Sequence, residues 1–173
     1  MMTSLSSECA LPGEDCSLEL KLLVDLIPRR SWFQNVRAVI DRRDWDLLRY
    51  TVFSRAGYAC ELCGVTDTSL ECHERFTYTI GQSKTHGVQR IIRLLAVCKA
   101  CHLTTHFGLS TILGIERESA AHLMRVRNWS ESEAQNHIAD AVLEWELRND
   151  VSWTVDLSMI VAAGYRLTAS AKS

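Results

Sequence analysis

The chain has 173 residues, of which 47% are hydrophobic and 23% are charged, a balance that excludes an intrinsically disordered chain. A net charge of −2 excludes a protein that coats nucleic acid through bulk positive charge. The first residues lack the basic and apolar segments of a secretory signal, and no apolar run is long enough to span a bilayer. We therefore expect a cytoplasmic protein with no membrane partner, whose seven cysteines serve metal or redox chemistry rather than disulfides.

The N-terminal third is predicted to change from loose to helical. Residues 1–17 are polar, and we expect them to be weakly ordered. Cys9 and Cys16 lie in this stretch and are expected to bind nothing. Residues 18–57 are predicted to form a helical segment. Its clearest helix covers residues 41–56, where apolar side chains recur at helical spacing and a glycine follows as a natural stop.

Charge is unevenly distributed along the chain. From Arg29 to Arg55 there are seven arginines and three aspartates, whereas residues 116–150 contain eight acidic residues and four arginines. The basic stretch predicts either solvated helix faces or a surface that faces nucleic acid.

Two Cys-x-x-Cys motifs, 34 residues apart, mark the core of residues 58–108. Each motif can donate two thiolates to a tetrahedral ion, the usual arrangement of structural zinc. Four thiolates leave no open coordination position, so this zinc is expected to be architectural and to contribute to folding. The competing interpretations are a redox-active pair and simple buried cysteines. The βαβ context of the redox motif is absent, and two matched pairs favour zinc. The expected zinc ligands are Cys60, Cys63, Cys98 and Cys101.

Three histidines accompany the cysteine motifs. Residues 70–80 and 88–97 are predicted to form two strands, the first of which carries His73. A short helix should follow and carry His102 and His106, which are four residues apart and so share a face. If the first strand folds back over that helix, the three side chains can share a second metal ion.

The remaining residues, 109–173, are predicted to form a C-terminal helical extension. Ser130 and Glu133 match a capping box at the start of one helix. Residues 151–157 alternate between apolar and polar side chains and predict a last strand. The expected fold class is therefore α+β and mainly helical.

The central motifs resemble the HNH (ββα-metal) endonucleases, in particular their zinc-stabilised, four-cysteine branch. A closer likeness, to bacterial proteins assigned to that family, covers roughly residues 28–163. The matching motifs are Cys60-x-x-Cys63, Leu70-Glu-Cys-His73-Glu74 and Val97-Cys-Lys-Ala-Cys-His102-x-x-x-His106. The resemblance implies a ββα-metal core around the zinc site, flanked by an N-terminal helix and C-terminal helices.

The resemblance also implies an activity. Family members hydrolyse phosphodiester bonds in DNA as endonucleases or nickases, with one divalent cation stabilising the phosphate and the leaving oxygen. The second cation expected here is Mg²⁺, Mn²⁺, Ni²⁺ or Zn²⁺. Carried over to this sequence, the ligands of that cation are His73, His102 and His106.

The position of the family's general base departs from the usual pattern. The residue after the first-strand ligand is Glu74 rather than histidine, and glutamate is a weak base unless burial raises its pKa. In an alternative register His73 is the base, and Cys72 or Glu71 becomes a metal ligand.

A second departure concerns the asparagine that usually pins the loop, which is Arg93 here. Arginine can instead hold a phosphate bidentately, and Lys84 and Arg90 are expected to contact further phosphates. Because fold does not fix function, the alternative is a catalytically silent zinc module that binds nucleic acid or a protein partner.

Overall fold

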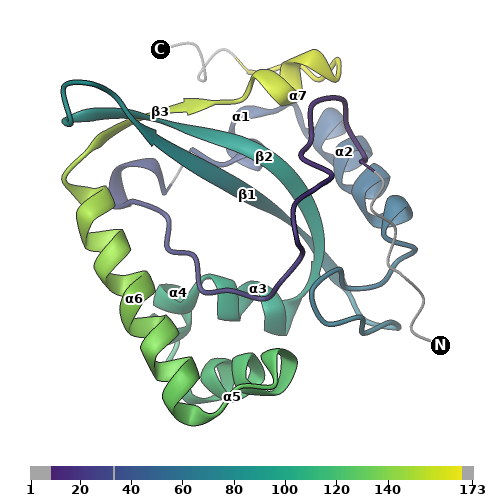
Figure 1. Ribbon diagram of the computed structural model, residues 1–173. Helices are drawn as coiled ribbons and strands as arrows, with labels where there is room; N and C mark the ends of the chain where they lie inside the picture. Colours follow the sequence, from purple (N-terminus) through teal and green to yellow (C-terminus); the bar gives the residue numbers. More distant parts are fainter. Residues whose placement is uncertain (1–8, 33, 169–173) are drawn as a thin grey trace.

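The computed structural model describes residues 9–32 and 34–168, and it confirms an α+β fold (Figure 1). In chain order the elements are a 3-10 turn (Arg29–Ser31), α1 (Val36–Val39), α2 (Arg42–Arg55), β1 (Leu70–Ile80), β2 (His86–Cys98), α3 (Lys99–Thr105), α4 (Phe107–Ile112), α5 (Glu116–Arg127), α6 (Glu131–Asn149), β3 (Ser152–Asp156) and α7 (Ser158–Ala162).

A long antiparallel hairpin of β1 and β2 organises the sheet, whose strand order is β1-β2-β3. The short β3 pairs in parallel with β2 near the hairpin tip, where His86 lies opposite Ser152. At the other end β2 stops at Cys98, and α3 begins at the next residue (Figure 1). The predicted order of strand, strand and helix is confirmed, and β1 occupies an edge of the sheet.

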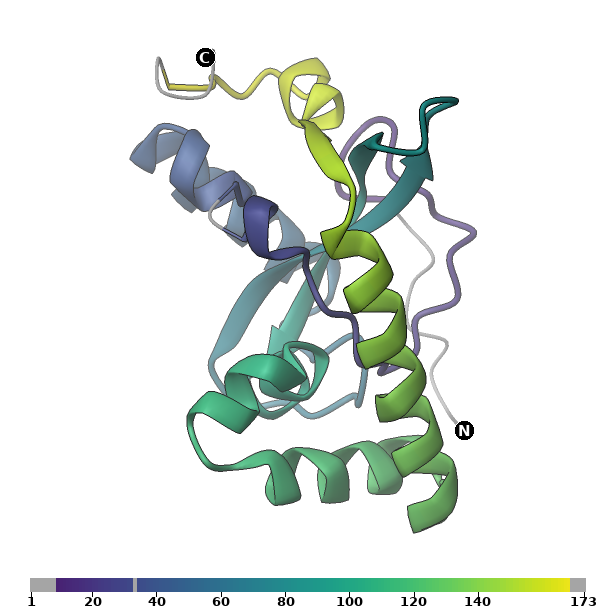
Figure 2. The ribbon, with the colours of Figure 1, turned by 90° about the vertical axis from the view of Figure 1, so that its left-hand side faces the viewer.

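The hairpin is covered by different elements on its two faces. Because side chains alternate along β2, Leu94 and Ala96 face α2, whereas Leu95 and Val97 face the helical layer that contains α3 and α5. All four side chains are at most 1% exposed, so β2 runs through the centre of both cores. In Figure 2, α6 connects α5 at the bottom of the molecule with β3 nearer the top.

The long helix α2 matches its predicted extent within one residue at each end. The Asp41 carboxylate accepts the backbone N–H of Arg43 at 2.9 Å and caps the helix. Leu48, Val52 and Phe53 are buried against the sheet. The capping box of α6 is confirmed as well, with Ser130 and Glu133 exchanging hydrogen bonds.

The prediction of a helical segment is wrong for residues 18–28, which run as an extended strap between α3 and α6. Leu22, Val24 and Leu26 are buried, and the residues between them are more exposed. That period of two is the signature of an extended chain. The Asp25 N–H donates to the carbonyl of Thr105 at 3.0 Å and ties the strap to α3.

The expectation of unpaired cysteines is wrong for Cys9 and Cys16, which form a disulfide. The turn between them brings their Cα atoms to 5.6 Å. The Glu14 carboxylate holds that turn by accepting the backbone N–H groups of Ala10 at 2.6 Å and Leu11 at 3.2 Å. Among the described residues, no helix has the length and hydropathy needed to cross a membrane.

We predict that His137 makes the strap sensitive to acid. Its Nε2 accepts the backbone N–H of Val24 at 3.0 Å, and burial, followed by nearby Arg127, lowers its pKa below 6.5. Because the unfolded chain then binds the proton more readily, this contribution to stability is complete above pH 6.5 and is lost progressively as the pH falls below 6.5 through the lower pKa of the folded chain. The free energy of unfolding, measured by urea denaturation between pH 7.5 and 5.5, should therefore fall less steeply in His137→Gln. The exposed His86→Gln should leave the slope unchanged, and an unchanged slope in His137→Gln would contradict the prediction.

Candidate metal centre

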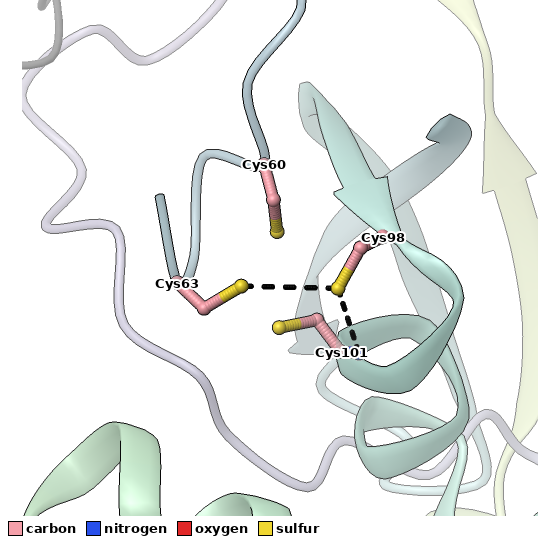
Figure 3. Close-up of side chains that lie close together, drawn as sticks. All are labelled: Cys60, Cys63, Cys98 and Cys101. Atoms are coloured by element: carbon pink, nitrogen blue, oxygen red, sulfur yellow. Dashed lines mark hydrogen bonds between the residues drawn. The ribbon is translucent and has the colours of Figure 1, made fainter. Parts of the chain in front are cut away.

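The four predicted zinc ligands converge on one point between the turn after α2 and the start of α3 (Figure 3). Their sulfur atoms all lie within 4.8 Å of one another, and Cys63 Sγ is 3.8 Å from Cys98 Sγ. Zn–S bonds of about 2.3 Å in a tetrahedron place the sulfurs about 3.8 Å apart. The spacing therefore suits a tetrahedral ion such as zinc.

Local backbone geometry explains why the sulfurs converge. Gly64 adopts a φ of +76°, which lets its N–H return to the carbonyl of Cys60 at 2.8 Å. On the other side, Cys98 caps α3 and its sulfur accepts the N–H of Cys101 at 3.5 Å. Amide groups at the start of the helix thus point toward the thiolates.

The cysteine sulfurs cannot all ionise together without a compensating cation. A hydrogen bond from Cys101 lowers the pKa of Cys60 to about 4, and the same interaction raises the pKa of Cys101. Burial raises the pKa of Cys63 to about 11. A divalent cation offsets this repulsion and allows all four to bind as thiolates.

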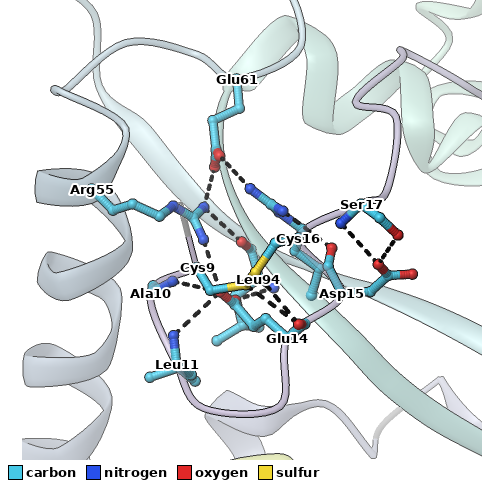
Figure 4. Close-up of a disulfide and its surroundings, with 11 residues drawn as sticks. Cys9, Ala10, Leu11, Glu14, Asp15, Cys16, Ser17, Arg55, Glu61 and Leu94 are labelled. Atoms are coloured by element: carbon cyan, nitrogen blue, oxygen red, sulfur yellow. Dashed lines mark hydrogen bonds and ion pairs between the residues drawn. A yellow bond between two sulfur atoms is a disulfide. The ribbon is translucent and has the colours of Figure 1, made fainter. Parts of the chain in front are cut away.

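A buried ionic network, shown in Figure 4, braces the first cysteine pair. The carboxylate of Glu61 accepts the Ala96 N–H at 2.7 Å and pairs with Arg55 at 2.5 Å and Arg93 at 3.6 Å. Arg55 also pairs with Glu14 at 3.0 Å, in the turn closed by the disulfide. Two acids and two arginines thus balance one another, which is the condition for burying charges.

This network corrects the expectation for Arg93. Its side chain is 1% exposed, pairs with Glu61 and donates to the carbonyl of Asp15 at 3.1 Å, so it does not contact phosphate. Arg90 pairs with Asp156 at 2.7 Å near the hairpin tip, and Lys84 lies in the turn of that tip. Neither of them lines the cleft described below.

We predict that replacing Cys60 removes the metal and much of the stability. Structural zinc sites contribute several kcal/mol to folding, and each kcal/mol moves Tm by about 2–4 °C in a chain of this size. Cys60→Ala should bind no zinc after dialysis and melt at least about 10 °C lower. Cys72→Ala removes a half-buried cysteine outside the quartet and should keep its zinc. One retained zinc per chain in Cys60→Ala would refute the assignment.

A hydrogen-bond relay reaches the cysteine quartet from α5. Arg125 Nη2 lies 2.8 Å from His122 Nδ1, and a guanidinium can only donate, so Nδ1 is the acceptor. Nε2 then carries the hydrogen and donates to Cys101 Sγ at 3.2 Å. Burial and Arg125 lower the pKa of His122, which keeps the ring in this neutral form. No sequence motif pointed to this residue.

Replacing His122 should loosen the metal without unfolding the chain. Partners that orient metal ligands typically contribute about 10–100-fold in metal affinity. In His122→Phe the thiolate of Cys101 loses its donor, so zinc transfer to a chromogenic chelator should be faster by about that factor. The exposed His86→Phe is the matched control, and equal transfer rates in the two variants would count against the relay.

The three predicted histidines form a second cluster one helical turn beyond the quartet. Their ring nitrogens lie within 4.8 Å of one another, with His73 on β1, His102 on α3 and His106 directly after α3. Ring centroids are 5.3 Å apart for His73 and His102, 5.0 Å for His73 and His106, and 4.7 Å for His102 and His106.

Unpaired nitrogens make this cluster suitable for a cation. His73 is 2% exposed, and neither of its ring nitrogens has a hydrogen-bond partner among the described residues; His106 Nδ1 is likewise unpaired there. Buried polar atoms rarely remain unsatisfied, and a metal ion is one way to satisfy them. Burial and the neighbouring histidines lower the pKa of His73 well below 6.5 and that of His106 to about 4, so both rings are in the neutral form that binds metals.

Glu71 and Glu74 occupy different positions around the cluster. Glu71 lies two residues before His73 on the same strand face, and its carboxylate pairs with His102 Nδ1. This contact orients the ring and leaves Nε2 available to a metal. Glu74 lies on the opposite face, where its carboxylate accepts the N–H of Val36 at 2.9 Å and burial raises its pKa above 4.5.

A cleft of about 940 Å³ reaches the histidine cluster from solvent. It follows β1, with α1 and α2 on one side and α3 and α4 on the other. The basic run noted in the sequence contributes three cleft residues that motif analysis did not single out: Arg37, Arg42 and Arg49. The other polar and aromatic residues that line the cleft include Trp32, Asn35, Trp45, Asp46, Glu71, Glu74, His102 and His106.

Comparison with known proteins identifies no relative. No family model, curated protein or solved structure matches the chain.

Proposed function

We propose that this chain is a metal-dependent phosphodiesterase of the HNH (ββα-metal) type, an endonuclease or nickase that acts on DNA. The observation that carries the proposal is the histidine cluster at the point where a hairpin runs directly into a helix, beside four cysteines suited to zinc. A hairpin and a helix that grip one cation are the arrangement that the sequence resemblance implies. The cleft gives an extended substrate access to that point.

We assign the three histidines as ligands of the second cation. His73 and His106 are held neutral by burial, and Glu71 orients His102, so the chain presents three nitrogens without a large rearrangement. A divalent cation bound there would supply electrostatic stabilisation for the negative charge that develops on the phosphate and the leaving oxygen.

Glu74 is the residue that we assign to accept the proton of the attacking water. Its raised pKa makes it a better base than an exposed glutamate, and it lines the same cleft as His102. The Val36 N–H donates to one carboxylate oxygen and fixes the side chain. The alternative register would give this role to His73, but its lowered pKa suits a ligand better than a base.

A catalytically silent zinc module is the second candidate function. One specific observation favours it: His73 is 2% exposed, and the ring of Trp32 packs edge-on against His106 with centroids 5.9 Å apart. In that case the histidines hold a second structural ion, and the cleft binds a nucleic acid or a protein partner without catalysing its hydrolysis.

Cleavage of supercoiled plasmid tests the two candidates. The zinc-loaded chain should nick the plasmid when Mg²⁺, Mn²⁺, Ni²⁺ or Zn²⁺ is added. His73→Ala should abolish nicking while keeping the tightly bound zinc, and Glu74→Gln should slow it about 100-fold or more, the usual contribution of a general base. The matched control is His86→Ala, which removes an exposed histidine and should nick at the normal rate. Absence of metal-dependent nicking by the folded, zinc-loaded chain would favour the silent module.

A further inference from the structure

The wall of the cleft opposite the histidines carries positive charge that is not neutralised. Arg37 and Arg42 are exposed, and neither has an acidic partner among residues 9–32 and 34–168. Arg49 is seven residues after Arg42, which places it two turns along the same face of α2 and about 10 Å farther along the helix axis. All three arginines line the cleft.

The acidic residues of the cleft are already engaged. Asp46 accepts Arg49 Nε at 2.9 Å, Glu71 pairs with His102, and Glu74 accepts a backbone N–H. Arg37 and Arg42 thus remain available for an anion from outside. The hairpin tip differs, because Arg90 is neutralised by Asp156 there.

Aromatic side chains line the same cleft. Trp32 stands beside His106, and Trp45 follows Arg42 by one turn of α2. A groove that combines arginines for the phosphates with aromatic rings for the bases is the usual design for a single nucleic-acid strand. In an intact duplex the bases are paired and stacked on one another, so only an unpaired strand can present its bases to these rings.

We propose that the cleft binds a single strand of DNA, with phosphates at Arg37 and Arg42 and with bases against Trp32. The strand would then bring one phosphodiester to the histidine cluster at the floor of the cleft. The placement of a phosphodiester at the histidines rests on the proposed function. The contacts with the arginines and with Trp32 hold the strand whether or not cleavage occurs. These arginines replace Lys84, Arg90 and Arg93 as the phosphate contacts expected from sequence.

Fluorescence anisotropy tests the proposal independently of cleavage. The probes are a labelled 12-nucleotide DNA strand and its blunt duplex, titrated with the zinc-loaded chain without added divalent cation. The single strand should bind more tightly than the duplex. Arg37→Gln/Arg42→Gln should weaken strand binding about tenfold or more and flatten the slope of log K against log salt by about 1.4, because each phosphate contact on a single strand contributes about 0.7.

The matched control removes the same charge elsewhere. Arg43→Gln/Arg117→Gln changes two exposed arginines that do not line the cleft, and it should bind the strand normally. Equal binding by the two double variants would overturn the phosphate contacts of Arg37 and Arg42, and a duplex bound as tightly as the strand would overturn the preference for single strands. If the cleft double variant melts lower than its control, the single variant Arg37→Gln, at an exposed position, tests the phosphate contact instead. It should flatten the slope of log K against log salt by about 0.7. A chain that binds the strand as expected but cleaves neither that strand nor plasmid when a divalent cation is added would refute the proposed function and leave this inference standing.

Discussion

The convergence of four sulfur atoms at the junction of β2 and α3 is the constraint on which the rest of the site depends. Cys98 ends the strand, caps the helix and belongs to the quartet, so one residue fixes the direction in which α3 leaves the sheet. Cys101 is followed at once by His102, whose position is therefore set by the sulfurs. His73 is aligned opposite Leu95, three residues before Cys98, and so reaches the same turn of the helix. The cysteine quartet therefore also fixes the positions of the three histidines.

The sequence predicted those parts of the molecule whose signals are local. The cysteine pairs, the helix at α2, the capping box at Ser130 and the two hairpin strands depend on spacing over a few residues, and each is found where it was expected. The meeting of His73 with the two helical histidines required only that the strand fold back along the hairpin. The HNH assignment itself stays a prediction.

Features that depend on long-range partners were not predictable in this way. Arg93 looked like a free phosphate ligand because nothing near it in sequence is acidic, whereas its partner Glu61 lies 32 residues earlier. The pairing of Cys9 with Cys16 depends on a turn held by Glu14, whose own partner Arg55 is 41 residues away. Such pairs are decided by tertiary packing, which overrides local propensity.

The strap and β3 have a consequence for the order of folding. The hairpin closes through a short turn and α3 follows without a break, and Cys63 meets Cys98 across 35 residues, far fewer than separate the strap from α6. By contrast, Arg148 of α6 meets Asp25 of the strap across 123 residues, and β3 must wait for the chain from α3 to α6 before it can pair with β2. Local contacts form faster than distant ones because their loop-closure entropy is smaller. We therefore expect the metal-binding unit to assemble first and the two ends of the chain to close over it afterwards, an order that pulsed hydrogen exchange during refolding can follow.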